Sequence, residues 1–322
     1  MAMVSPSTAL KLSQYVTMFF GTFMTFFPAP LMDGYKGDTF VGEANALFQF
    51  MMGIFGTQML LMSMIFGACA RDAVPAASQS VACLASACFW VFFAVSDGRH
   101  LITGTLPGAI PPDGVIGNLF LFAMMAGVSL AGWVDGGKVK PDFGKFVPTG
   151  PAKAPLTVAM LNLLSFGIPL TLMTRTFMDM FWEEGFLERL PGTTVTVKDG
   201  PFASKTVPVG PLEGPLPMME LIMGNAGKCV LTAVLTALAV ISVGGDEAAG
   251  DVTFRMLRAF SLQGMFYVGT LARDGVLLTA TGWPSLMRVP LFLQTFGVCF
   301  YIVNQMAALT PVLPAAAKSK KK

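Results

Sequence analysis

Long apolar stretches alternate with short polar ones along almost the whole chain. Eight apolar runs lie near residues 15–31, 44–69, 78–95, 115–133, 157–174, 218–243, 252–271 and 289–308. Each run, as a helix rising about 1.5 Å per residue, is long enough to cross the roughly 30 Å hydrocarbon core of a membrane. The pattern predicts an all-α integral membrane protein with about eight transmembrane helices.

Composition argues against a soluble helical protein. Hydrophobic residues make up 54% of the chain and charged residues 12%, whereas soluble domains carry about 25% charged residues. Eight hydrophobic helices in a soluble fold would need amphipathic partners to face water, and almost none are present. Because no short hydrophobic region with a cleavage site precedes the first run, we expect the first helix to serve as its own insertion signal.

The distribution of Lys and Arg predicts how the chain is oriented. Twelve of these residues fall on the side that holds both termini and eight on the other side. Since positive residues tend to stay on the cytoplasmic side or its equivalent, both termini are expected on the positive-inside face. The tail "KSKKK" is interpreted first as a topology anchor, with a retrieval signal or a lipid-binding patch as alternatives. Thylakoid, mitochondrial inner membrane and endoplasmic reticulum all remain open.

Two landmarks recur at matching places in two sets of four runs. The step Gly53-x-x-Gly56 recurs as Gly224-x-x-Gly227, and Asp97-Gly98 recurs as Asp274-Gly275 at a nearly equal distance along the chain. We interpret this as two tandem four-helix repeats of equal polarity, related by an axis along the membrane normal. The repeats cover 1–134 and 157–310, with a Gly/Pro/Lys-rich linker at 135–156 and a basic tail at 311–322.

The Gly-x-x-Gly spacing places two missing side chains on one side of a helix, which lets another backbone approach closely. We therefore interpret these four glycines as helix-packing positions. A cavity or the approach of a cofactor is the alternative.

The loop at 182–217 differs from the short loops elsewhere. It contains "TTVTVKDGPFASKTVPVG", in which alternating Thr and Val flank a turn signal, and this predicts a small β-hairpin between helices five and six. Such a hairpin is marginal alone in water. We interpret the loop as a docking element for another subunit, with polar contacts from Arg189, Lys198 and Lys205.

Polar residues at membrane depth are costly, and they are treated as candidate functional residues. The sixth run holds Glu220, Asn225 and Lys228, of which Glu220 and Lys228 lie on one helix face about two turns apart. Lys228 needs a partner, for which Asp274, Glu220 or a bound anionic headgroup are the candidates. The intramembrane amides are Gln49, Gln58, Asn118, Asn162, Gln263, Gln294, Asn304 and Gln305. Such amides usually join helices by hydrogen bonds, and they can also coordinate a chlorophyll magnesium.

The sequence offers no catalytic constellation. The lone histidine, His100, rules out a site built on two histidines, and the five cysteines form no Cys-x-x-Cys pair. Phosphate-binding loops, nucleophile elbows and zinc-protease motifs are missing from the sequence. A formal charge of +2 gives no nucleic-acid signature. We therefore expect no metal site, no enzymatic activity and no nucleic-acid partner.

Three functions are favoured, and a lipid-modifying or redox enzyme is a further alternative, for which the sequence offers no complete proton-handling or metal-binding set. The first is a non-catalytic accessory or structural subunit of a larger membrane complex, in contact with the lipid bilayer and other membrane subunits. The second is a small-molecule carrier or channel built from two repeats. The third is a pigment- or lipid-binding subunit, such as a photosynthetic antenna-linker protein, for which bound lipid, chlorophyll or carotenoid would be the cofactor; the chain's 28 Phe and 23 Met offer apolar surface for it.

Overall fold

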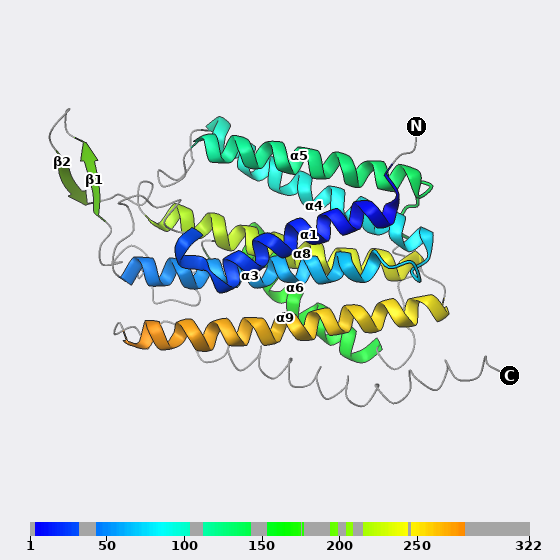
Figure 1. Cartoon of the computed structure of the whole chain (residues 1–322). Coiled ribbons are helices and arrows are strands. Elements are labelled where there is room, and N and C mark those ends of the chain that lie inside the picture. Colours follow the sequence, from blue (N-terminus) through cyan, green and yellow to red (C-terminus); the bar gives the residue numbers. More distant parts are fainter. Residues whose placement is uncertain are drawn as a thin grey trace.

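The computed structural model describes a bundle of long helices with a separate pair of strands (Figure 1). The described residues are 4–31, 43–103, 112–142, 153–174, 176, 194–198, 204–208, 215–243 and 246–280. Helices α1 (Pro6–Phe26), α3 (Glu43–Cys69), α4 (Ala76–Thr103) and α5 (Pro112–Asp135) belong to the first half of the chain. Helices α6 (Lys153–Leu172), α8 (Pro215–Val243) and α9 (Asp246–Ala280) belong to the second half.

Five helices among the described residues are long and apolar enough to cross a membrane. These stretches are Phe48–Cys69, Ala76–Thr103, Asp113–Asp135, Pro155–Leu172 and Glu220–Val243. They coincide with the second to the sixth predicted runs, and the chain is accordingly a multi-pass integral membrane protein. The finer prediction of eight spans is supported for these five only.

The remaining three predicted runs differ from these five. Helix α1 begins at Pro6, well before the predicted start at 15, because the Ser5 side chain accepts a hydrogen bond from the Thr8 backbone N–H at 3.2 Å and caps the helix. Its added first turns carry Lys11 and other polar residues. Helix α9 includes Arg255 and Arg258, which lower its apolar character. The eighth predicted run lies outside the described residues.

The end of α5 coincides with the predicted start of the linker. Gly137 adopts a φ of 88°, and the Lys138 backbone N–H bonds the Trp133 carbonyl at 3.0 Å while the Gly137 N–H bonds the Val134 carbonyl at 3.2 Å. This is the hydrogen-bonding pattern of a glycine-terminated helix, in which the left-handed residue closes the last carbonyls. A glycine at 137 therefore ends the fourth long helix of the first half.

Helix α3 is the central helix of the bundle. In its most apolar stretch 89% of the residues are buried inside the protein, compared with 22% in the corresponding stretch of α5. It packs against α1, α8 and α9. A helix that is hydrophobic all round is expected in such a buried position.

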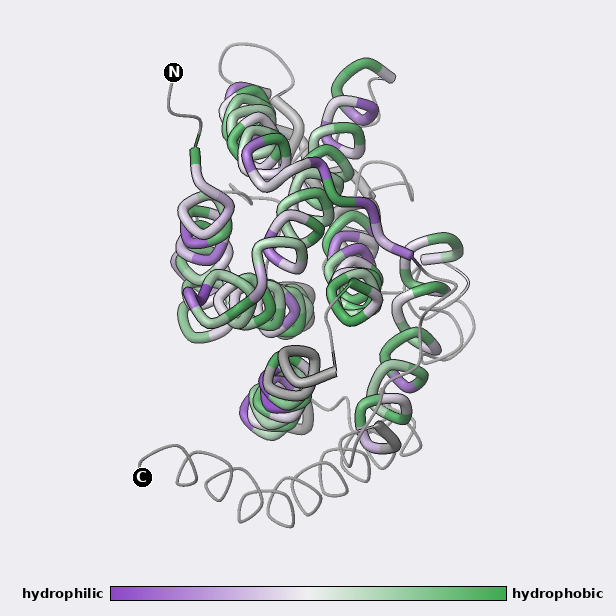
Figure 2. Tube along the Cα trace, turned by 90° about the vertical axis from the view of Figure 1, so that its right-hand side faces the viewer, coloured by the Kyte–Doolittle hydropathy of each residue, from purple (hydrophilic) through white to green (hydrophobic). Residues whose placement is uncertain are grey.

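The outer helices present apolar side chains outward. Phe19 of α1 is 64% exposed, Phe120 of α5 is 74% exposed and Leu161 of α6 is 62% exposed. Figure 2 shows hydrophobic residues on outward as well as inward faces of the helices. This surface is suited to lipid tails, in agreement with contact with the bilayer.

Glycines allow the closest helix contacts. A Cβ atom added at Gly56 of α3 would lie 2.5 Å from the backbone nitrogen of Thr25 in α1, and one at Gly227 of α8 would lie 2.9 Å from that of Thr171 in α6. Real Cβ contacts are essentially never this short, so only glycine fits. Gly224 meets a looser neighbour, the Thr174 hydroxyl at 3.3 Å.

Strands β1 (Thr194–Lys198) and β2 (Ser204–Pro208) pair antiparallel within the loop where the sequence predicts a hairpin. The register pairs Thr194 with Pro208 and Lys198 with Ser204. In Figure 1 the two strands lie beyond one end of the helical bundle.

Candidate functional site

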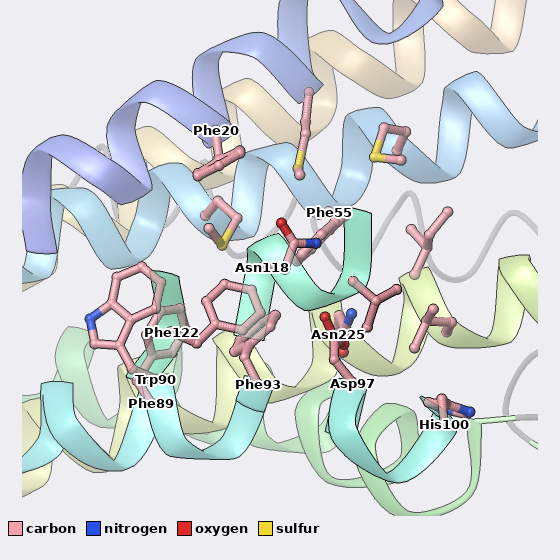
Figure 3. Close-up of a pocket in the computed structure, with 16 residues that line it drawn as sticks. Phe20, Phe55, Phe89, Trp90, Phe93, Asp97, His100, Asn118, Phe122 and Asn225 are labelled. Atoms are coloured by element: carbon pink, nitrogen blue, oxygen red, sulfur yellow. The ribbon is translucent and has the colours of Figure 1, made fainter. Parts of the chain in front are cut away.

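A pocket opens between helices of both halves. It is bounded by α1, α3, α4 and α5 of the first half and by α8 of the second, and its cavity volume is about 100 Å³. Figure 3 shows the side chains that line it. One part of the lining is aromatic and apolar, and the other part carries the polar side chains of Asp97, His100, Asn118 and Asn225.

Helix α4 supplies much of the aromatic wall, because Phe89, Phe93 and Asp97 recur every four residues and so share one face of the helix. Phe93 contacts two neighbouring helices through its ring: its centroid lies 6.3 Å from that of Phe55 in α3 and 5.6 Å from that of Phe122 in α5. These offset and edge contacts are the favoured geometries for aromatic pairs. The wall is therefore held by packing among three helices.

A buried cluster of serines fixes Trp90, which also lines the pocket. The indole N–H donates to the Ser13 hydroxyl at 3.1 Å. Ser13 bonds Ser86 at 2.8 Å, and Ser86 bonds Ser129 at 3.0 Å, so that α1, α4 and α5 meet at three fully buried hydroxyls. Satisfied networks of this kind give side chains a single arrangement.

The polar end of the pocket is formed by three helices. Asp97 comes from α4, Asn118 from α5 and Asn225 from α8, and Asn225 points toward Asp97 in Figure 3. His100 lies one turn beyond Asp97 on α4. The side chains together offer carboxylate and amide oxygens as acceptors and amide N–H groups as donors.

Lys228 of α8 contributes a positive charge beside this end. Its Nζ donates to Ser96 Oγ at 2.5 Å and to Asn225 Oδ1 at 2.8 Å. The same Nζ lies 6.0 Å from the centroid of the Phe93 ring, the outer limit for a cation–π contact. Asp97 directly follows Ser96 on α4, so that a carboxylate and an ammonium group lie near each other at this end of the pocket. The two charges belong to different halves of the chain.

The structure thus brings together Asp97, Asn118, Asn225 and Lys228, which the sequence singled out separately. Lys228 bonds Ser96 and Asn225. Neither was among the partners considered from the sequence, which were Asp274, Glu220 and a lipid headgroup. The Asp274 side chain lies outside the described residues. Glu220 is half-buried on α8.

Four of the other intramembrane amides, Gln49, Gln58, Asn162 and Gln263, are described, and none of the four lines the pocket. Gln263 Nε2 of α9 donates to Gln58 Oε1 of α3 at 3.2 Å, and both side chains are buried. This pair joins two helices, which is the ordinary role of amides in membranes. Gln49 and Asn162 are half-buried. Gln294, Asn304 and Gln305 lie outside the described residues.

The docking residues proposed for the loop are described in part. Lys198 ends β1 and Lys205 is the second residue of β2, so that both lie at the turn end of the hairpin. Arg189 lies outside the described residues. Of Lys198 and Lys205 only the backbone is described.

Within the described residues, no group of three or more His, Cys, Asp or Glu side chains could hold a metal ion. Four cysteines of that part of the chain, Cys69, Cys83, Cys88 and Cys229, are free thiols.

Sequence reasoning missed the aromatic residues and Ser96. Phe and Trp are common in membrane helices, so their number alone gives no signal. The spacing of Phe89, Phe93 and Asp97 on one face could have indicated that an aromatic stripe leads to a carboxylate. The contact between Ser96 and Lys228 joins positions far apart in the sequence and has no local signal.

Comparison of the chain with protein-family models, with curated proteins and with solved structures gives no match. Its function is accordingly inferred from its own residues.

Proposed function

We propose that this protein binds a small amphipathic molecule in the pocket between its two halves, as a membrane carrier or channel for that molecule. The observation that carries the proposal is the convergence of Asp97, Asn118, Asn225 and Lys228 at one end of an aromatic-lined cavity. Ligand sites combine a mostly apolar lining with a few polar groups that fix orientation. This cavity has both.

The volume of the cavity limits the ligand. About 100 Å³ is somewhat less than the roughly 150 Å³ of an apolar cavity that holds one benzene molecule. A single ring or the end of an aliphatic chain fits such a space. The macrocycle of a chlorophyll does not, so this pocket favours a small molecule over that pigment.

The polar end indicates the charge of the ligand. Asp97 lines the pocket and Lys228 lies beside it, bonded to Asn225, so that a carboxylate and an ammonium group are both present at this end. A neutral polar group, such as a hydroxyl or a carbonyl, can then bond an amide without leaving a buried charge unpaired. The proposed ligand is an apolar ring or chain that ends in such a group.

The proposal places the ligand site between two repeats, and neighbouring helices support the repeats. If α1, α3 and α4 correspond to α6, α8 and α9, the contact of α1 with α3 corresponds to that of α6 with α8. The contact of α3 with α9 then corresponds to that of α8 with α4. In Figure 1, α3 and α8 both start at the end of the bundle near the hairpin, which agrees with halves of equal polarity. Transporter sites commonly lie at the interface between repeats.

The glycine contacts support the repeats at the level of single residues. A Cβ at Gly21 would lie 2.8 Å from the Leu60 backbone nitrogen, and one at Gly167 would lie 3.2 Å from that of Leu231.

The contacts of Gly56 with Thr25 and of Gly227 with Thr171 follow the same register. The number of residues from Gly21 to Gly167 equals the number from Thr25 to Thr171. The number from Leu60 to Leu231 likewise equals the number from Gly56 to Gly227. The second number is the larger of the two, and the extra length falls in the loop that contains the hairpin. Both pairs of contacts are therefore consistent with one duplicated unit.

Filling the pocket is expected to abolish ligand binding. Ile222 is 3% exposed and lines the cavity, and Ile222→Trp would occupy the space of one ring. Phenol, a single planar ring with one hydroxyl donor, should raise the midpoint of thermal unfolding of the wild-type protein in detergent. A ligand at 100 times its Kd stabilises a protein by about 2.7 kcal/mol. The variant should show no such shift.

The matched control is Leu235→Trp on the same helix, since Leu235 is 44% exposed and lies outside the pocket. It should keep the full response to phenol. Equal shifts of the unfolding midpoint in wild-type protein and in Ile222→Trp would show that phenol binds elsewhere, and the pocket proposal would fail.

A second function, that of an accessory subunit of a membrane complex, is favoured by the hairpin. Two strands that lie beyond the end of the bundle (Figure 1) are marginally stable alone in water, so a partner surface would stabilise them. The turn end of the hairpin carries Lys198 and Lys205, which can supply polar contacts to that partner.

Deletion of about residues 193–209 tests this second function. The helices should still fold, as judged by circular dichroism and thermal unfolding, while the protein should elute at a lower mass than wild-type protein extracted from the native membrane in mild detergent. An unchanged mass in the deletion variant would contradict a docking role for the hairpin.

A further inference from the structure

A second cavity, wide and open, lies between α1 and α9 on the face of α3. Its volume is about 660 Å³. The side chains that line it include four cations and one acid, which are Lys11, Arg71, Arg255, Arg258 and Asp72. We call this cavity the basic groove. It shares no lining residue with the aromatic pocket.

Small residues of α3 form the floor of the groove. Helix α3 packs against both α1 and α9, and Gly67 and Ala68 face the space between these two helices. The Gln14 amide covers Gly67, because a Cβ there would lie 2.7 Å from Gln14 Cδ. The small residues of the floor leave room for a ligand beside the Gln14 and Met64 side chains, which also line the groove.

Arginine geometry in the groove suits a phosphate group. The Arg258 guanidinium lies over the Phe254 ring, with its Cζ 4.6 Å from the ring centroid. Such stacking leaves the N–H edge of a guanidinium available for an oxyanion, and arginine bonds phosphate through two parallel N–H groups. Among the described lining residues four cations outnumber one carboxylate, that of Asp72, which favours an anionic group in the groove.

Apolar side chains continue from the cations toward the middle of the helices. On α1, Lys11 is followed four residues later by Tyr15, which is 56% exposed; on α9, Arg258 is followed four residues later by Leu262, which is 44% exposed. Residues four apart share a helix face. Each charged position thus lies one turn from an exposed apolar one, as an anionic headgroup with an attached tail requires.

If the two halves are repeats, the four cations of the groove have no charged counterparts at the corresponding positions of the other half. The steps that relate Gly21 to Gly167, Gly56 to Gly227 and Asp97 to Asp274 lead from the four cations to uncharged residues in the other half. These corresponding residues are Thr157, Ser242, Ser78 and Val81. A general excess of positive charge at this end of the bundle would have placed cations at these corresponding positions as well.

We propose that the basic groove binds the phosphate-bearing headgroup of an anionic membrane lipid, with the lipid tail against Tyr15 and Leu262. The site is independent of the aromatic pocket, and its failure would leave the ligand proposed for that pocket unaffected.

The test compares two double variants in nanodiscs that contain phosphatidylcholine with or without phosphatidic acid, with bound lipid counted by native mass spectrometry after release into detergent. Arg71→Gln/Arg258→Gln removes two exposed groove cations. Each cation near an anionic lipid surface strengthens binding by about five-fold, so that loss of two cations should weaken the retention of phosphatidic acid by roughly 30-fold. Phosphatidylcholine retention should not change.

The control, Lys138→Gln/Lys140→Gln, removes two exposed cations that do not line the groove, and it should keep phosphatidic acid within about two-fold of wild type. Lys11→Gln, a single exposed change, gives an independent measure with an expected loss of about five-fold should the double variant unfold. Equal losses in groove and control variants, or no loss in either groove variant, would overturn the site. Displacement of the lipid by inorganic phosphate alone would overturn its assignment to a lipid.

Discussion

Lys228→Met is expected to lower the free energy of unfolding by about 3 kcal/mol, because the Ser96 and Asn225 side chains would lose their charged hydrogen-bond donor. Hydrogen bonds to charged groups contribute about 1.5–3 kcal/mol each, and the lower end applies because Ser96 is only half-buried. Asn225 Oδ1 lies 2.8 Å from this donor. Thermal unfolding of the purified protein in detergent measures the effect.

The double variant Lys228→Met/Asp97→Asn removes both charges and should recover part of the lost stability. The cycle of single and double variants isolates the interaction between the two side chains. Lys138→Met, at an exposed position just after α5, is the control and should change stability by less than about 0.5 kcal/mol. Additive losses in the cycle would mean that Asp97 and Lys228 do not act as a pair.

Leucine in place of Gly56 or Gly227 is expected to destabilise the protein by about 1–3 kcal/mol or more. At each position the first added carbon would lie under 3.0 Å from backbone atoms of the preceding long helix. A backbone cannot rotate away as a flexible side chain can, so the helices must separate. Thermal unfolding and the yield of folded protein measure the loss.

Gly127→Leu on α5 is the matched control, because an added Cβ there meets no heavy atom within 4 Å. Leucine is a better helix former than glycine by up to about 1 kcal/mol, so this variant should be as stable as wild type or slightly more stable. If Gly56→Leu and Gly227→Leu behave like Gly127→Leu, the close approach of the helices at these glycines is wrong.

The sequence could predict the long helices because hydropathy is a local property. The runs at 44–69 and 115–133 correspond to α3 and α5 to within a few residues at their ends. The Thr–Val alternation at 194–198 similarly marks β1. Eight spans were predicted and five are supported among the described residues. For α9 the difference arises because Arg255 and Arg258 make the helix less apolar than the predicted run suggests.

The site could be predicted only in part. Asn225 and Lys228 stood out because polar groups at membrane depth are costly, and Asp97 stood out as a repeated landmark. Their convergence depends on the rotation of α4 against α8, which no local pattern encodes. Phe93 and Trp90 look like any aromatic residue of a membrane helix until the packing of α3, α4 and α5 is known.

The central claim is that the aromatic pocket between the halves binds a small amphipathic molecule. It is tested most directly by titrating phenol into the purified protein and its Ile222→Trp variant and measuring the heat of binding. One site per chain is expected in the wild-type protein and none in the variant. Binding of equal affinity and stoichiometry to both proteins, or to neither, would contradict it.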